Sequence, residues 1–134
     1  MDSPSTETRP LRVVVVGPCA SGKSTLAGRL RSYGFDAYVC AQEHSEIGTL
    51  WRHLDPDAVI ALDVDLATVR RRRGDDWPET IYREQRRRLA PARAAADAII
   101  DTSSLDADQA VEVALRALSN LPLRRVRHAA DASA

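Results

Sequence analysis

The chain has 134 residues, with 19 basic and 19 acidic side chains and two cysteines. This length suits one small domain with its own core, and the balanced charge gives no general attraction to nucleic acid or to anionic membranes. The sequence has neither the apolar run of a membrane span, the framework of cysteines of a disulfide-rich protein, nor the apolar segment of a secretory signal near its start, so we expect a cytoplasmic protein.

Alternating strands and helices are predicted along residues 11–121, between a disordered segment at 1–10 and a flexible tail at 122–134. Short apolar runs predict the strands, and apolar residues that recur every three to four positions predict the helices. In chain order the predicted elements are strand 11–17, helix 23–33, strand 37–41, a short helix or loop at 43–54, strand 58–62, a helix capped by Asp65, a helix from Pro78 to about residue 94, strand 96–101 and a helix within 102–120.

This alternation predicts an α/β fold with a parallel sheet of about four strands and helices on both faces, which makes three layers. If strand 37–41 lies directly beside strand 11–17, the strand order is 2-1-3-4. Ligands of such sheets bind at the carboxyl ends of the strands. The segments that follow the strands are therefore the ones expected to form a site, namely 17–24, 42–45, 63–65 and 102–104.

The most specific motif follows the first strand, whose four consecutive valines indicate burial on both faces. The segment from Gly17 to Ser24 matches G-x-x-x-x-G-K-[ST] at every fixed position, and an amphipathic helix follows it. In this motif backbone N–H groups cradle phosphates, Lys23 reaches the β- and γ-phosphates, and the Ser24 hydroxyl binds Mg²⁺. Lys23 is also the only lysine of the chain. The predicted nucleotide-binding residues here are Gly17, Pro18, Cys19, Ala20, Ser21, Gly22, Lys23, Ser24 and Thr25.

With two further segments, "VIALDVDLATVRRRRGDDWPETIYREQRRRL" and "ADAIIDTSSLDADQAVEVAL", the chain resembles the kinase branch of P-loop NTPases. That branch includes nucleoside monophosphate kinases, shikimate kinase and dephospho-coenzyme A kinase. The resemblance implies the P-loop NTPase fold, ATP and Mg²⁺ as cofactors, and a mobile lid at about residues 70–92. It also implies that Arg73 and Arg83 clamp phosphoryl oxygens, that Arg71 or its neighbour Arg70 stacks on adenine, and that the loop containing Ser103 contacts the base.

The chain departs from this family in three places. Four strands fit rather than the usual five, and the segment between Glu43 and Ala58 has room for one short helix rather than an acceptor-binding insertion. The Asp that usually organises Mg²⁺ after the second strand is absent, and "AQEHS" stands there instead. Glu43 is the acid of that segment. It could orient Mg²⁺-bound water, or it could accept the proton of an acceptor hydroxyl, which a glutamate does in the loosely similar deoxynucleoside kinases.

For several other residues the sequence allows both a functional role and a purely structural one. Asp63 formally matches a metal-binding acid after four apolar residues, although the expected strand order places it away from the Mg²⁺ strand. His44 is better explained as a polar loop residue than as a catalyst. Trp51 and Trp77 are better explained by packing than by stacking on an acceptor. Each lid arginine taken singly is better explained as part of a solvated helix face.

The predicted function is transfer of the γ-phosphate of ATP to a small-molecule acceptor by a monomer or homodimer, with no nucleic acid or membrane as partner. The alternative is a nucleotide-dependent switch or weak ATPase that acts through a partner protein. A nucleotide-binding module without chemistry is disfavoured by the retention of Gly22, Lys23 and Ser24. A GTPase is disfavoured because the chain has no N-K-x-D motif.

Overall fold

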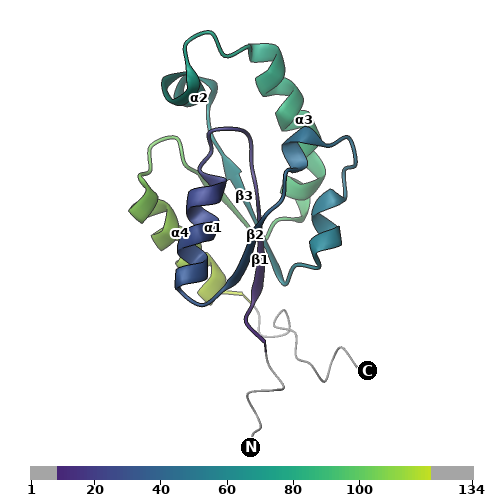
Figure 1. Cartoon of the computed structure of the whole chain (residues 1–134), viewed down its shortest axis with the longest axis vertical. Helices are drawn as coiled ribbons and strands as arrows, with labels where there is room; N and C mark the ends of the chain where they lie inside the picture. Colours follow the sequence, from purple (N-terminus) through teal and green to yellow (C-terminus); the bar gives the residue numbers. More distant parts are fainter. Residues whose placement is uncertain (1–8, 122–134) are drawn as a thin grey trace, which may run out of the picture.

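The protein is described by a computed structural model that covers residues 9–121, and the predictions for residues 1–8 and 122–134 lie outside this range. One sheet runs through the centre of the molecule (Figure 1). All its neighbouring strands pair in parallel, in the spatial order β2-β1-β3-β4, which confirms the predicted α/β class and strand order. The strands are β1 (Arg12–Val16), β2 (Asp36–Val39), β3 (Ala58–Asp63) and β4 (Ala98–Asp101).

The helices of the described range are α1 (Lys23–Ser32), α2 (Leu66–Arg73), α3 (Glu79–Ala95) and α4 (Ala107–Ser119). Where a short helix or loop was predicted at 43–54, the structure has two 3₁₀ helices, η2 (Gln42–His44) and η3 (Leu50–Leu54). The predicted cap at Asp65 is confirmed, because its side chain accepts a hydrogen bond from the Thr68 N–H. No helix within residues 9–121 is long and apolar enough to cross a membrane.

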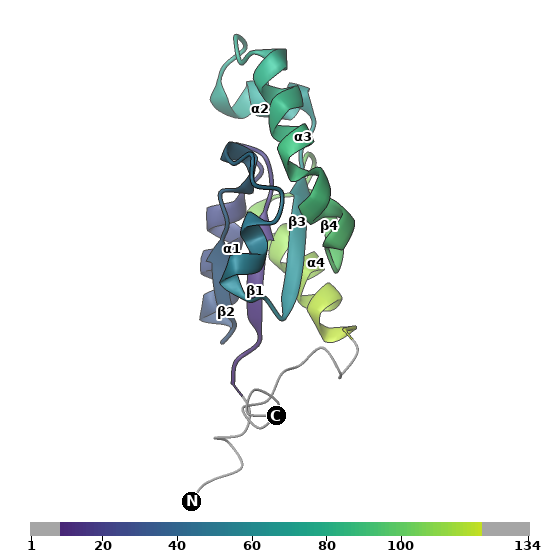
Figure 2. The same cartoon turned by 90° about the vertical axis from the view of Figure 1, so that its right-hand side faces the viewer.

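The valines of β1 alternate between the two faces of the sheet and so join the two halves of the core. Val13 and Val15 pack with residues of α1 and α4, and Val14 and Val16 pack with residues of α3. Helices α1 and α4 therefore cover one face, and α3 with the two 3₁₀ helices covers the other (Figures 1 and 2). Helix α1 ends at Ser32, one residue before the predicted end, and the side chain of Tyr33 is exposed.

Helix α2 and the first turns of α3 lie beyond the carboxyl ends of the strands, at the top of both views (Figures 1 and 2). The loop between β1 and α1 ends at the same edge of the sheet. This arrangement brings residues of the 17–24, 63–73 and 101–107 segments together, although they are far apart in the sequence. The carboxyl edge is therefore the place to look for a site.

Candidate functional site

The loop between β1 and α1 has a backbone that only a small set of residues permits. A Cβ atom at Gly17 would lie 2.6 Å from Ser21 Oγ and 3.0 Å from the backbone oxygen of Leu62, so a side chain at this position would clash. Ala20 and Gly22 have φ values of 67° and 93°, in the left-handed region. Alternation of left- and right-handed residues turns successive N–H groups toward one concavity, which is the backbone arrangement of anion-binding nests.

Among the residues that the structure describes, no side chain caps the N-terminus of helix α1. Its N-cap is Gly22, no side-chain hydrogen bond caps it within the described residues, and its first turn has no acidic residue. By contrast, the carboxylates of Asp65 and Asp106 cap α2 and α4. A helix start carries partial positive charge and up to four free N–H donors, so the α1 end is suited to an anion.

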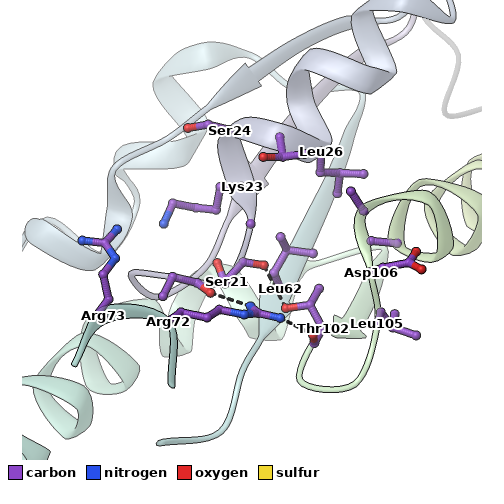
Figure 3. Close-up of a pocket in the computed structure, with 15 residues that line it drawn as sticks. Ser21, Lys23, Ser24, Leu26, Leu62, Arg72, Arg73, Thr102, Leu105 and Asp106 are labelled. Carbon is purple, nitrogen blue, oxygen red and sulfur yellow. Dashed lines mark hydrogen bonds between the residues drawn. The ribbon is translucent and has the colours of Figure 1, made fainter. Parts of the chain in front are cut away.

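A pocket of about 460 Å³ opens at this helix end, between α1, α2 and the start of α4 (Figure 3). Its charged lining consists of three cationic side chains and one carboxylate, and the latter already accepts a hydrogen bond from the Gln109 N–H. The pocket is therefore electropositive at one end, whereas leucine and alanine side chains line the other. The lining residues are Ala20, Ser21, Gly22, Lys23, Ser24, Thr25, Leu26, Leu62, Arg72, Arg73, Thr102, Leu105, Asp106, Ala107 and Ala110.

Arg72 joins two segments of the pocket wall. Its guanidinium donates to the backbone oxygen of Ala20 at 2.6 Å and to that of Thr102 at 3.0 Å (Figure 3). The Thr102 hydroxyl in turn donates to the backbone oxygen of Ser21 at 2.8 Å. The 17–24 loop is thus held to α2 and to the end of β4 by contacts with its carbonyl groups.

Lys23 and Glu43 meet at the base of the loop. Lys23 Nζ lies 2.9 Å from Glu43 Oε2 and donates to the backbone oxygen of Pro18 at 3.0 Å. Glu43 is 4% exposed, and its second oxygen, Oε1, has no hydrogen-bond partner among the residues that the structure describes. A buried carboxylate oxygen without a donor is costly, so this atom is poised to accept a proton or bind a cation.

Cys19 lies beside the same carboxylate. Its Sγ is 3.8 Å from His44 Nε2, which is itself 3.6 Å from Glu43 Oε2. The buried side chain of Gln85 holds Cys19 from α3: its amide donates to Sγ at 3.2 Å, and its oxygen accepts from the Cys19 N–H at 3.0 Å. One N–H group of the loop is therefore taken by a side chain of the helix that covers the other face of the sheet.

The remaining predicted site residues lie at different distances from this pocket. Arg73 lines it, and its guanidinium lies over the Trp77 ring at 5.9 Å from the centroid. Seven predicted site residues are not among the described lining residues: Gly17, Pro18, Cys19, Glu43, Arg71, Arg83 and Ser103. Of these, Arg71 donates to the Thr68 hydroxyl, Arg83 pairs with Glu79, and the Ser103 hydroxyl accepts from the Asp65 N–H. Their predicted roles toward a nucleotide stay predictions.

Asp63, at the end of β3, is engaged by an arginine. Arg93 contacts both of its carboxylate oxygens, at 2.9 Å through Nε and at 2.7 Å through its terminal nitrogen. This charge-assisted pairing raises the pKa of Arg93. The geometry agrees with a structural role for Asp63 rather than the metal-binding role of the formal motif match.

Three residues of the site were not singled out from the sequence. Arg72 sits in a run of four arginines, in which no pattern distinguishes the two that line the pocket. Gln85 could have been found, because it occupies the same helix face as the buried residues Leu89 and Ala92, where a polar residue signals a buried contact. Asp106 carries the signature of a helix cap, and only the tertiary structure shows that it also lines the pocket.

Comparison of the chain with protein-family models and with curated proteins found no match to either.

Proposed function

We propose that this chain binds Mg²⁺-ATP in the pocket at the start of α1 and transfers the γ-phosphate to a small-molecule acceptor, as its resemblance to the kinase branch of P-loop NTPases implies. One observation carries the proposal: the uncapped start of α1 opens into a pocket that Lys23, Arg72 and Arg73 also line. Free N–H groups and three cations around one cavity form a receptor for a polyanion.

The two ends of the pocket support a nucleotide rather than a simple anion. The triphosphate would lie against residues 20–24, where the helix end and Lys23 supply positive charge. The base would lie toward Leu105, Ala107 and Ala110, where an apolar surface can pack against an aromatic ring. A volume of about 460 Å³ is within the range of small-molecule sites.

The residues have distinct roles in this proposal. Lys23 leaves Glu43 and binds the phosphates, and Arg73 neutralises charge on the transferred group. Ser24, at the uncapped helix end, would hold Mg²⁺ together with the phosphate oxygens, and the ion would supply charge neutralisation there. The unpartnered oxygen of Glu43 accepts the proton of the acceptor hydroxyl, whose oxygen then bonds to the γ-phosphorus as the bond to ADP breaks.

The second candidate function is a switch or weak ATPase that acts through a partner, and one observation favours it. The segment between β2 and β3, where an acceptor would be expected, is filled by its own side chains. Gln42 is fully buried and bonds to the Ile47 carbonyl and the Trp51 N–H, while Trp51 packs against the core beneath α3. A pocket for an acceptor would then have to form by movement of this segment.

The experiment that separates the two functions is release of ADP from Mg²⁺-ATP. The full chain is assayed alone and with pooled nucleosides, nucleoside monophosphates or hydroxylated metabolites. Stimulation by one pool, followed by subdivision of that pool, would identify a kinase and its acceptor. Slow release that no pool changes would favour the switch.

Nucleotide binding at Lys23 can be tested directly by chemical modification of this side chain. Because Lys23 is the only lysine, its side chain and the N-terminus are the only amines on which an acylating reagent can act. Mg²⁺-ATP should slow acylation of Lys23 and leave that of the N-terminus unchanged, as followed by peptide mass spectrometry. Equal acylation rates at Lys23 with and without nucleotide would contradict the proposed site.

A further inference from the structure

We propose that Cys19, Glu43 and His44 form a binding site for a borderline-soft divalent metal ion such as Zn²⁺, in which the metal competes with Lys23 for the Glu43 carboxylate. One ligand atom of each of the three residues lies within 4.8 Å of the other two. The three residues come from the 17–24 loop and from η2, so the metal would fasten the loop to the end of β2.

The distances are close to those of a metal site. Zn²⁺ binds sulfur at ~2.3 Å and nitrogen or oxygen at ~2.0–2.2 Å, so tetrahedral ligands lie about 3.3–3.6 Å apart. The observed separations are 3.8 Å between Cys19 Sγ and His44 Nε2 and 3.6 Å between His44 Nε2 and Glu43 Oε2. Small rotations of these side chains would therefore bring them to one ion.

The chemistry of the donors selects the kind of metal. A thiolate with an imidazole is a poor set for Mg²⁺ or Ca²⁺, which prefer oxygen, and a good one for Zn²⁺ or Co²⁺. Three protein ligands leave a fourth position open to water or to another ligand. The site is thus chemically distinct from the Mg²⁺ position proposed at Ser24.

Two further observations point to a ligand at this cluster. Glu43 is almost entirely buried, and its Oε1 has no hydrogen-bond partner among the described residues. Gln85, also buried, donates to Cys19 Sγ and thereby orients the sulfur. Such supporting contacts to the ligands are typical of metal sites.

Lys23 competes with the metal for the Glu43 carboxylate. Its ammonium lies 2.9 Å from Glu43 Oε2, so the carboxylate cannot hold Lys23 and a divalent ion in the same position without repulsion between the two cations. Removal of the Lys23 charge should therefore strengthen metal binding. A purely structural role of the three residues would not predict this gain.

The test is titration of the untagged full chain with Co²⁺, without nucleotide, followed by the thiolate-to-metal charge-transfer absorption. We expect the band in the wild type and its loss in Cys19→Ala. Cys40→Ala is the matched control, since burial raises the pKa of the Cys40 thiol and disfavours its thiolate. Absence of the band in the wild type, or its persistence in Cys19→Ala and loss in Cys40→Ala, would overturn the proposal.

Three further variants test the remaining ligands and the competition. His44→Ala should weaken Co²⁺ binding by roughly tenfold or more, whereas His53→Ala should leave it unchanged. Lys23→Met should tighten it, and weaker or equal Co²⁺ affinity in this variant would contradict the competition. Circular dichroism checks that each variant is folded, and Cys19→Ser replaces Cys19→Ala if the alanine variant is not.

The consequence for activity rests on the proposed function. Zn²⁺ at this site would occupy the carboxylate that is proposed to accept the proton, and would thus inhibit phosphoryl transfer while leaving Lys23 free for the phosphates. The Co²⁺ titration needs neither ATP nor an acceptor, so its failure is distinct from failure of the kinase proposal.

Discussion

Lys23 and Glu43 form a buried ion pair, with 2.9 Å between Nζ and Oε2, that joins the first residue of α1 to η2. Their side chains are 11% and 5% exposed. Such a pair is costly to break on one side, because the partner left behind remains a buried charge. A ligand that draws Lys23 toward itself also removes the cation that is paired with Glu43. The two residues therefore couple the pocket to the cluster of Cys19, Glu43 and His44.

Replacing Lys23 with alanine should abolish ATP binding or weaken it strongly. A charged hydrogen bond to phosphate contributes ~1.5–3 kcal/mol, and loss of positive charge at the helix start adds to this. Isothermal titration with Mg²⁺-ATP measures the effect. Arg116→Ala, an exposed arginine of α4 that pairs with Glu112, is the matched control and should bind as the wild type does. Unchanged affinity in Lys23→Ala would refute the nucleotide site.

Glu43→Gln should retain ATP binding and lose turnover. The amide keeps the size of the side chain but cannot accept the acceptor's proton, and loss of a general base typically costs ~10²–10⁴-fold in rate. Binding should be equal or tighter, because Lys23 no longer has to leave a carboxylate. Titration and ADP release, measured on the same preparation, separate the two effects. Full turnover of Glu43→Gln would remove this residue from the mechanism.

Arg72→Ala and Arg73→Ala should each weaken binding of Mg²⁺-ATP, because both guanidinium groups line the pocket. Arg83→Ala is the informative comparison. In this structure Arg83 is exposed and paired with Glu79, so it should affect turnover only if α3 moves toward the pocket during the reaction. Titration and single-turnover rates of the three variants test this. Equal affinity of the wild type, Arg72→Ala and Arg73→Ala would contradict the assigned pocket.

Asp63→Asn should lower stability without affecting ATP binding. The change breaks a bidentate pair with Arg93, but both side chains keep contact with solvent, at 21% and 39% exposed, so the expected loss is only ~1 kcal/mol. Urea unfolding measures it. Glu112→Gln, in an exposed pair with Arg116 on α4, is the control and should change stability by less than about 0.5 kcal/mol. Loss of ATP binding in Asp63→Asn would favour the metal-binding interpretation of its formal motif match over the structural one.

Asp36 should contribute to acid unfolding. The side-chain hydrogen bond from Arg12 lowers the pKa of Asp36, and desolvation by burial opposes this effect. Because the pKa is lower in the folded state, the stabilisation is present above the unfolded value of about 3.9 and is lost as the pH falls through the folded value.

Thermal unfolding of the wild type and Asp36→Asn between neutral and acidic pH tests this. The melting temperature of the variant should be lower at neutral pH, and the difference should shrink at acidic pH as Asp36 becomes protonated. Asp108→Asn, at a highly exposed position, provides the control. A difference in melting temperature that is the same at all pH values would show that the charge of Asp36 is not its cause.

The local elements were predictable because their signals lie in adjacent residues. Four valines between polar residues predicted β1, and the cap at Asp65 predicted the start of α2; the structure has both. The strand order also followed, because parallel strands joined by helices have few permitted arrangements. The start of α4 was predicted only within 102–120; Asp106, whose capping signature was not used, starts the helix at Ala107.

The sequence by itself determined the α/β class, the strand order and the loop with Lys23, because hydrophobic periodicity and glycine positions are local properties of a chain. Only the tertiary structure decided which two of the clustered arginines line the pocket, and it alone paired Lys23 with Glu43 and Asp63 with Arg93. The physical reason is that these contacts depend on how helices pack across the carboxyl edge of the sheet. A rotation of about 100° per residue along α2 places Arg72 and Arg73 at the pocket and directs Arg71 elsewhere, to the Thr68 hydroxyl.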